Sequence, residues 1–287
     1  MTDASEATPV DQARRAVAAA AGRSGVELTA VEDMDTLREV SDLFARVWGR
    51  SDEGVPMHSE AIRSLAHAGG LVTVARDRAN GRLLGAAALG RDVPGWCYSY
   101  LAAVAPGSHD RGIGWALKHH QRSWALSQEL QVMSWTFDPL VSRNGRFNTV
   151  KLGALVEEYE PAFYGQMSDD LNGGDIGDRM VVRWHLGSAR ALAAADGALA
   201  GPETPCSERA EVVEVGPDGA AAYLESGSGA DRWVRVPADI VRLRKEDPDQ
   251  AAAWRGLTSR WLSAAFAAGL VADGVSREGW YHLGPSV

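Results

Sequence analysis

The sequence has little cysteine: its 287 residues include only Cys97 and Cys206, which lie far apart and form no CxxC pair. This scarcity argues against a disulfide framework and against a zinc ribbon, and it suits a reducing compartment. The sequence also has no run of about 18 apolar residues, the length that a membrane-spanning helix needs. Its N-terminus lacks the basic and then apolar order of a signal peptide. We therefore expect a cytoplasmic protein with no membrane contact and no metal site.

Positive charge is scarce as well. Lysine and arginine number 29 against 38 aspartates and glutamates, so the formal net charge is −9 at pH 7. Such a surface repels nucleic acid unless a local basic patch overrides it, and we expect no bulk nucleic-acid partner. Apolar residues make up 45% of the chain and charged residues 23%, an ordinary globular balance. The length fits one large domain or two modest ones.

Hydrophobic patterning predicts an α/β (α+β) fold. Short alternating runs indicate strands, and apolar positions at helical spacing indicate helices. Between residues 25 and 186 the predicted order is strand, helix, hairpin, strand, loop, helix, strand, helix, strand, strand. Asn80-Gly81 marks the hairpin turn, because both residues tolerate positive φ. This order predicts a mixed, mostly antiparallel sheet flanked by helices.

Changes in composition predict the domain organisation. Residues 1–24 are polar and Ala-rich and are expected to be an N-terminal extension, with at most one loose helix. Residues 25–188 form the main domain, and 189–206, rich in Ala, Gly and Pro, form a connector. Residues 207–287 are expected to form a smaller C-terminal α/β domain. In it, Asp247-Pro248-Asp249-Gln250 has the pattern of a helix start.

The loop between a predicted strand that ends at Val104 and a helix that begins near Gly112 carries the main functional signal. It reads His109-Asp110-Arg111-Gly112-Ile113-Gly114. The first turn of a helix offers unpaired N–H groups and the positive end of the helix dipole. Glycine lets a pyrophosphate approach that backbone closely. The loop is neither a Walker loop, since no Gly-Lys-Ser/Thr ends it, nor a full dinucleotide fingerprint. It predicts an anion cradle, with a simple tight turn as the alternative.

On these residues the sequence resembles the GNAT superfamily of acyl-coenzyme A (CoA) N-acyltransferases. That family carries Gln/Arg-x-x-Gly-x-Gly/Ala between its fourth strand and the following helix. Gly112 and Gly114 match this pattern, whereas His109 departs from it. The element order of residues 26–186 also suits the family. The stretch Trp135–Leu140 followed by Arg143–Ala154 resembles a bacterial subgroup of predicted acetyltransferases.

The resemblance implies a GNAT-like acyltransferase domain that uses acetyl-CoA or another acyl-CoA as co-substrate. It implies transfer of an acyl group, acetyl being favoured, to the amine of a small-molecule acceptor by direct attack on the thioester. The resemblance implies that backbone groups of the fourth strand bind the pantetheine, namely Leu101, Ala102, Ala103 and Val104. It implies that residues of the loop and the helix start bind the pyrophosphate, namely His109, Arg111, Gly112, Ile113, Gly114 and Trp115. Asn144 is expected to contact the pantetheine as well.

The catalytic residues are less clearly marked. The family often places a tyrosine acid where this chain has Thr149, with Asn148 beside it. Tyr164, further along, is an alternative acid, with packing as its competing role. A thiol with a pKa of about 8.5 can also leave without a dedicated acid. Asp138, after the fifth strand, is a candidate base or ammonium ligand, or a turn-forming residue before Pro139.

The helix after the loop carries two adjacent histidines, of which we expect His119 to be solvated and His120 to be a core residue. Two functions besides small-molecule acylation stay open. One is a tRNA- or carrier-protein-dependent acyltransferase, and the second is a non-catalytic CoA-binding or regulatory protein. The absence of the usual tyrosine and of a glutamate on the fourth strand favours the second. A homodimer is expected from family habit alone.

Overall fold

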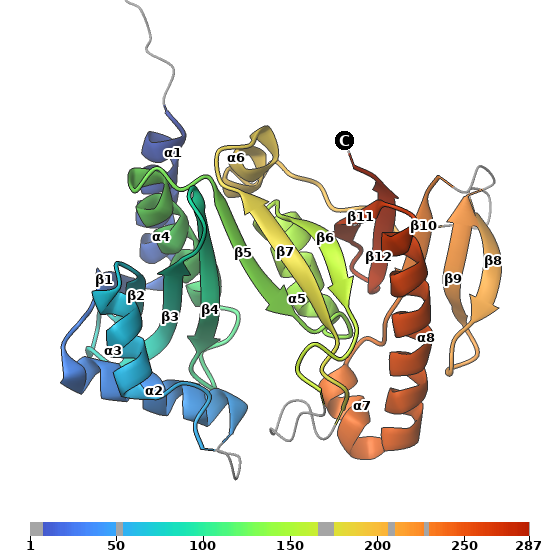
Figure 1. Ribbon diagram of the computed structural model, residues 1–287, viewed down its shortest axis with the longest axis horizontal. Coiled ribbons are helices and arrows are strands. Elements are labelled where there is room, and N and C mark those ends of the chain that lie inside the picture. The colour runs from blue at the N-terminus through green and yellow to red at the C-terminus, as the bar shows by residue number, and fades with distance from the viewer. Residues whose placement is uncertain (1–7, 50–53, 166–174, 206–209, 227–229, 287) are drawn as a thin grey trace, which may run out of the picture. The chain divides into compact units, whose positions relative to one another are not determined.

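The structure is a computed structural model that describes residues 8–49, 54–165, 175–205, 210–226 and 230–286 (Figure 1). Cys206 and the first seven residues of the expected N-terminal extension lie outside these ranges. The chain divides into two units. Unit 1 is Met1–Ser134 with His185–Asp196, and unit 2 is Trp135–Trp184 with Gly197–Val287.

Unit 1 contains a sheet with helices on both faces. Its strand order is β1-β2-β3-β4-β5, in which all neighbours are antiparallel except the parallel pair β4–β5. The elements are α1 (Pro9–Ser24), β1 (Val26–Ala30), α2 (Met34–Trp48), α3 (Ser59–His67), β2 (Leu71–Asp77), β3 (Leu83–Arg91), β4 (Trp96–Val104), α4 (Ile113–Ser127), the first half of β5 (Val132–Phe137), and α6 (Ala189–Ala195).

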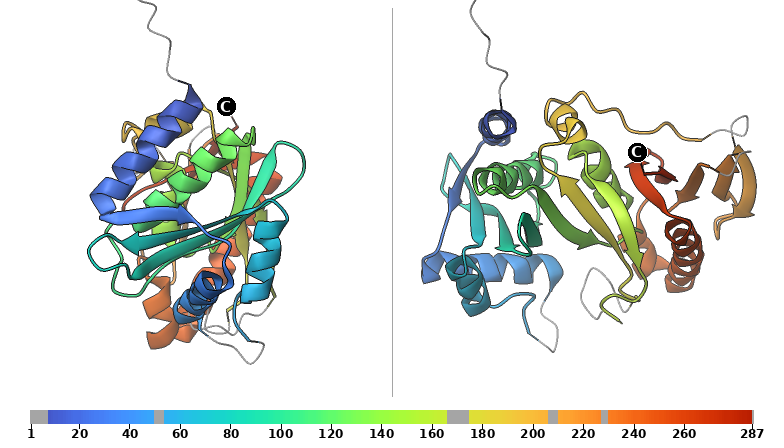
Figure 2. Two further views of the ribbon diagram at one scale, coloured as in Figure 1. Left: turned by 90° about the vertical axis from the view of Figure 1, so that its left-hand side faces the viewer. Right: turned by 45° about the horizontal axis from the view of Figure 1, so that its top comes forward.

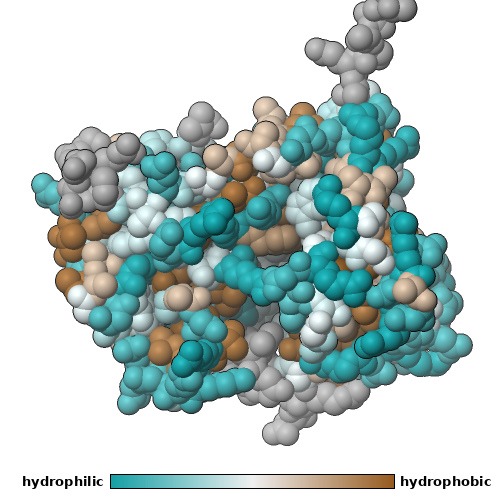
Figure 3. Space-filling model, turned by 180° about the vertical axis from the view of Figure 1, so that it is seen from behind, coloured by the Kyte–Doolittle hydropathy of each residue, from teal (hydrophilic) through white to brown (hydrophobic). Residues whose placement is uncertain are grey.

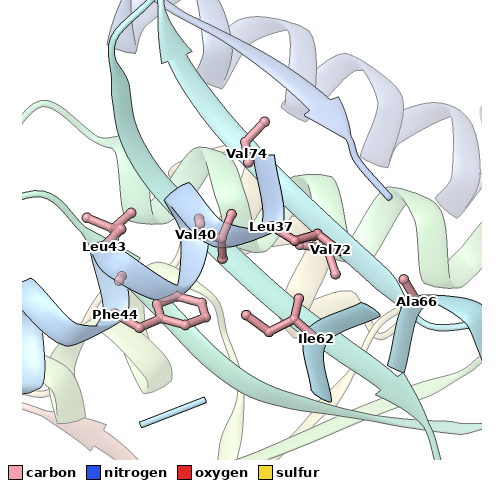
Figure 4. Close-up of a cluster of buried hydrophobic side chains, with 10 residues drawn as sticks. Leu37, Val40, Leu43, Phe44, Ile62, Ala66, Val72 and Val74 are labelled. Atoms are coloured by element: carbon pink, nitrogen blue, oxygen red, sulfur yellow. The ribbon is translucent and has the colours of Figure 1, made fainter. Parts of the chain in front are cut away.

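One face of this sheet is covered by α2 and α3. Leu37, Val40, Leu43 and Phe44 recur at helical spacing along α2 and are fully buried, in a cluster with residues of α3 and β2 (Figure 4). The opposite face packs against α4, whose Ile113 and Leu117 join Val26, Leu84 and Ala87 in a second cluster. The sheet is therefore buried on both faces.

Helix α1 is an ordered part of unit 1 and not a loose extension. Thr8 caps it by accepting a hydrogen bond from the Asp11 N–H, Pro9 opens it, and Gly25 ends it in the left-handed conformation. Ala13, Ala16 and Ala20 are buried on one face, and the helix lies beside α4 (Figure 2). Small side chains let the two helix backbones approach closely, so an Ala-rich segment of low hydrophobicity can still form a packed helix.

We predict that Phe44→Ala lowers the free energy of unfolding by about 3–5 kcal/mol. Phe44 is fully buried and its ring packs edge-on against Trp48, so truncation leaves a cavity in the α2 cluster. Urea unfolding would measure the loss. Val93→Ala is the control, because Val93 is 56% exposed and its truncation should change little. Equal stability of the two variants would contradict this account of the core.

Unit 2 is built around a second run of strands, in the order β7-β6-β11-β12-β10-β9-β8, with antiparallel neighbours. Its elements are α5 (Ser142–Arg146), the π-helix η1 (Phe147–Lys151), β6 (Leu155–Glu160), β7 (Arg179–His185), β8 (Ala210–Val215), β9 (Ala221–Ser226), β10 (Arg232–Arg235), α7 (Ile240–Glu246), α8 (Pro248–Ala267), β11 (Leu270–Val275) and β12 (Trp280–Pro285).

The C-terminal segment adds to this sheet and does not form a unit of its own. Ala272 of β11 pairs with Val156 of β6, and the Tyr281 hydroxyl donates a 2.8 Å hydrogen bond to the Pro139 carbonyl. The two units therefore differ from the ranges 25–188 and 207–287 expected from composition. Composition indicates the connector at 189–206, but pairing between a strand before it (β6) and a strand after it (β11) determines which segments pack together.

The free edge of the unit 2 sheet is strand β8. Val212, Val213 and Val215 are about half exposed there, and apolar surface lies on that side of the molecule in Figure 3. Glu211 and Glu214 lie among these valines, and charged side chains on an edge strand discourage pairing with another chain. Within the described ranges, no helix combines the length and the apolar character needed to cross a bilayer.

Candidate functional site

The loop that joins β4 to α4 has an unusual backbone. Gly107, Asp110 and Gly112 all have positive φ, at 80°, 65° and 79°. Glycine adopts this conformation without strain, whereas it is unfavourable for Asp110. A side chain at position 112 would also lie 3.3 Å from the Ser24 hydroxyl. Gly112 is therefore favoured both by its conformation and by its surroundings.

The start of α4 has no side-chain cap, although Ile113 itself is 1% exposed. Gly112 is the N-cap and supplies no side-chain cap, and the first turn has no acidic residue. The first bond within the helix runs from the Ala116 N–H to the Gly112 carbonyl, so the N–H groups of Ile113, Gly114 and Trp115 precede it. His109 and Gly112 are exposed. The N–H groups of Ile113, Gly114 and Trp115 form a row of donors at the positive end of the helix dipole, an arrangement that suits an anion.

Two contacts hold this helix start in place. A Cβ on Gly85 of β3 would lie 2.9 Å from Ile113 and 3.0 Å from Leu117, so only glycine lets α4 pack so close to the sheet. The Arg111 guanidinium donates to the Asp77 carboxylate at 3.3 Å and to the Ser24 carbonyl at 3.2 Å. Arg111 thus ties the loop to β2 and α1, which qualifies the expectation that it contacts the donor directly.

Strand β4 leaves its ladder with β5 before it reaches this loop. Its ladder with β5 consists of Trp96–Val132, Cys97–Met133 and Tyr98–Ser134, after which β4 runs on to Val104. On the other side, β3 pairs Ala88 with Leu101 and Leu89 with Ser99, so Tyr100 is the extra residue of a β-bulge. A bulge bends its strand and re-aims the neighbouring side chains. Leu101, Ala102, Ala103 and Val104 follow this bend, as the last part of β4 before the loop.

The structure also brings together a buried polar group that the sequence pattern does not indicate. Lys118 of α4 is buried, and its Nζ donates to the Ser99 hydroxyl at 2.9 Å. Ser99 in turn donates to Gln121 Oε1 at 3.0 Å. Burial lowers the pKa of Lys118 to about 7. A lysine next to two histidines looks like a solvated helix face, and no local signal distinguishes it.

The reason lies in the double burial of α4. The sheet covers one side of the helix and α1 covers another, so Lys118, His119, Gln121 and Arg122 are all buried. The expectation that His119 is solvated is wrong: it is fully buried, its ring centre lies 4.0 Å from that of Trp115, and its pKa falls to about 3 through burial. His120 is partly buried and contacts the Thr73 hydroxyl at 3.0 Å.

In unit 2, Asp138 belongs to a buried ion network. Its carboxylate accepts from Arg244 at 2.6 Å and from Arg255 at 2.9 Å, and both arginines also contact Asp175. The Leu140 N–H donates to it as well. Burial opposes ionisation, but Arg255 and Arg244 outweigh it and hold the pKa of Asp138 below its ordinary value. A carboxylate so stabilised is a weak base, and its ion pairs argue against binding an acceptor.

We predict that Asp138→Asn lowers the free energy of unfolding at neutral pH by about 3–5 kcal/mol, because it leaves buried arginine charge uncompensated. The pKa of Asp138 is depressed in the folded state, so its contribution is present above the unfolded value and is lost as pH falls through the folded value. Urea unfolding at several pH values should show the two proteins converging in acid. Glu203→Gln, at an exposed position, is the control. Unchanged stability with abolished activity would instead favour a catalytic Asp138.

The other expected catalytic residues have different surroundings. Asn148 is 3% exposed within η1, and the Thr149 hydroxyl donates to the Gly145 carbonyl at 2.9 Å. Tyr164 is 53% exposed and lies under the Arg179 guanidinium, 5.1 Å from the ring centre. Asn144 is exposed on α5. A π-helix often marks a functional position, because it re-aims side chains that a regular helix would place elsewhere. The roles of these residues stay predictions.

Part of the chain is similar to a known protein family. Residues 10–138 match the family model described as acetyltransferase (GNAT) domain. No curated protein matches the sequence.

Solved structures that match part of this chain include an IAA acetyltransferase from Bacillus cereus, with 14% identity, a TM-score of 0.42, and coverage of 55% of this chain and 97% of that one. A phosphinothricin acetyltransferase from Sinorhizobium meliloti, in complex with AcCoA, has 16% identity, a TM-score of 0.46, and coverage of 55% and 87%. A putative acetyltransferase from Salmonella typhimurium, with its cofactor acetyl-CoA, has 16% identity, a TM-score of 0.46, and coverage of 63% and 99%.

Proposed function

We propose that this protein transfers an acyl group, acetyl being favoured, from acyl-CoA to the amine of a small molecule, because residues 10–138 match the acetyltransferase (GNAT) domain model. The observation that carries the proposal is the uncapped start of α4, with its row of backbone donors behind Gly112. This arrangement supports the donor half of the reaction more directly than the acceptor half.

The donor would bind through backbone groups. The pyrophosphate of CoA would accept from the N–H groups of Ile113, Gly114 and Trp115, with His109 at the exposed rim of the loop. The pantetheine arm would follow Leu101–Val104, where β4 has left the ladder with β5. An N–H of this part of β4 would stabilise the thioester oxygen as negative charge develops on it.

The reaction is a direct displacement. The lone pair of the acceptor amine attacks the thioester carbonyl carbon, so a C–N bond forms and the C–S bond breaks. The amine loses a proton and the thiolate of CoA leaves. Backbone donors fixed by the fold serve this reaction well, because they need no reorganisation when charge moves onto the oxygen.

The net charge of the protein favours a small cationic amine as the acceptor. The net charge of −9 attracts cationic amines and repels tRNA, so a tRNA-dependent transferase is the weaker candidate. Transfer from a carrier-protein donor and non-catalytic CoA binding are two further candidate functions. The expected cytoplasmic location and homodimer stay predictions.

The donor site is tested by Gly112→Glu. This change adds a negative charge and a strained side chain where the pyrophosphate would lie, and we expect CoA binding to weaken by about 100-fold or more. Calorimetry with CoA and acetyl-CoA would measure it. Gly81→Glu is the matched control: Gly81 also has positive φ, at 72°, but nothing lies within 4 Å of an added Cβ in its hairpin turn. If Gly112→Glu keeps full affinity, the loop is not the donor site.

Transfer itself is tested by free-thiol release from acetyl-CoA with a panel of small amines. We expect release that depends on one class of amine and that Gly112→Glu abolishes. Acyl-CoA binding in the micromolar range without release for any amine would favour the non-catalytic function. No binding of CoA or acetyl-CoA at all would contradict both.

A further inference from the structure

The buried group around Lys118 is separate from the backbone groups proposed to bind the donor, yet it links the two elements that carry them, α4 and β4. Lys118 is on α4, the helix whose first turn forms the anion cradle. Its hydrogen-bond partner Ser99 is the residue of β4 that follows the last pair with β5 and precedes the bulge residue Tyr100. Lys118, Ser99 and Gln121 are 5%, 3% and 0% exposed.

Resting on the proposed function, we propose that Ser99 and Lys118 form a proton relay that protonates the departing CoA thiolate. Ser99 is the residue that would contact the sulfur, and Lys118 acts through it. The relay would supply the acid for which the family position offers only Thr149, whose hydroxyl is bonded to the Gly145 carbonyl.

The step balances in bonds and protons. As the C–S bond breaks, the sulfur takes the electron pair and then accepts the proton of the Ser99 hydroxyl. Ser99 Oγ regains a proton from the Lys118 ammonium along their 2.9 Å hydrogen bond, which leaves a neutral amine. Lys118 recovers a proton from the solvent, which has taken the proton lost by the acylated amine. Gln121 Oε1, which accepts from Ser99 in the absence of donor, keeps the hydroxyl oriented until the sulfur replaces it.

Burial suits Lys118 to this task. A lysine with its ordinary pKa of 10.5 would hold its proton more tightly than a thiol of pKa about 8.5, and transfer would be uphill. With the pKa of Lys118 lowered to about 7, the same transfer is downhill while the lysine still carries a proton near neutral pH. A weakly held proton on a buried amine is the state that proton transfer requires.

The charged groups around α4 leave this proton in place. From β4, the Cys97 thiol faces Lys118, and burial raises its pKa to about 12 although Lys118 and Arg91 oppose the rise, so it stays neutral. From β2, the Thr73 hydroxyl contacts His120. On the side of α1, Arg122 bonds to Gln12, and Arg23 acts on His119 and Trp115. The charges of the α1 side therefore act on other side chains.

A purely structural role for Lys118 would lower the stability of the protein. Because the folded pKa of Lys118 lies below the unfolded value, the unfolded chain binds more protons between pH 7 and about 10, and folding is penalised there. Stability from this residue rises as pH rises through that range. An apolar residue of similar length would fill the same space without the penalty. Lys118 lies next to the part of β4 that has left the ladder with β5, where a proton donor would be of use to the reaction.

The test is the ionisation of CoA bound to the intact protein, read from the ultraviolet absorbance of the thiolate, with the complex of desulfo-CoA subtracted. It needs no acceptor. Between about pH 6 and 7.5, where Lys118 still carries its proton in part, the ammonium stabilises the thiolate through Ser99. In that range we expect the thiolate fraction of bound CoA to be several-fold lower in Lys118→Met and in Ser99→Ala than in the wild type. Ser99→Thr keeps the hydroxyl and should behave as the wild type does.

Lys245→Met is the matched control, because Lys245 is exposed on α7 in unit 2. CoA affinity measured on the same samples separates the relay from the proposed function on which it rests. Equal ionisation of CoA in the wild type and in folded Lys118→Met, with CoA still bound, would overturn the relay and leave the proposed function standing. No CoA binding by the wild type would overturn both. Lys118→Met should fold, since it removes a buried charge, and Ser99→Ala tests the relay independently.

Discussion

The close packing of α4 against the sheet of unit 1 is the constraint on which the donor site depends. Gly85 permits it, since any side chain there would collide with Ile113 and Leu117. Arg111 then fixes the loop that precedes α4 to Asp77 and to the end of α1. A glycine that belongs to no functional motif thus lets α4 lie close to the sheet.

The same helix is buried a second time by α1. This second contact creates an interior where α4 would otherwise meet solvent, and it places ionisable groups there: His119, which loses its charge, and Arg122, which bonds to Gln12. Double burial therefore changes the chemistry of side chains without changing the path of the helix. An amphipathic pattern cannot reveal it, because a helix buried on two sides has no single polar face.

Unit 2 satisfies its buried charge in a different way. Asp138, Asp175, Arg244 and Arg255 come from four separate segments and neutralise one another, and Asp178 accepts from the Tyr159 hydroxyl at 2.6 Å beside them. Such a network adds little net stability but is costly to break, so it links the strand end at Asp138 to α7 and α8. The network thus adds to the strand pairing between β6 and β11 in joining the C-terminal segment to residues 135–184.

The sequence by itself determined the strands between residues 26 and 186, the hairpin at Asn80-Gly81, and the loop at Gly112, but it did not predict helix α3. The family resemblance drawn from that loop was confirmed, since residues 10–138 match the acetyltransferase (GNAT) domain model. These features are local: they follow from periodicity, from the conformational freedom of glycine, and from a motif of six residues. Only the tertiary structure decided which charges are buried and what they contact. It paired Asp138 with two arginines more than a hundred residues away and moved His119 out of solvent. It also brought Lys118 to Ser99. Burial and pairing depend on residues distant in the chain, so no local pattern carries them.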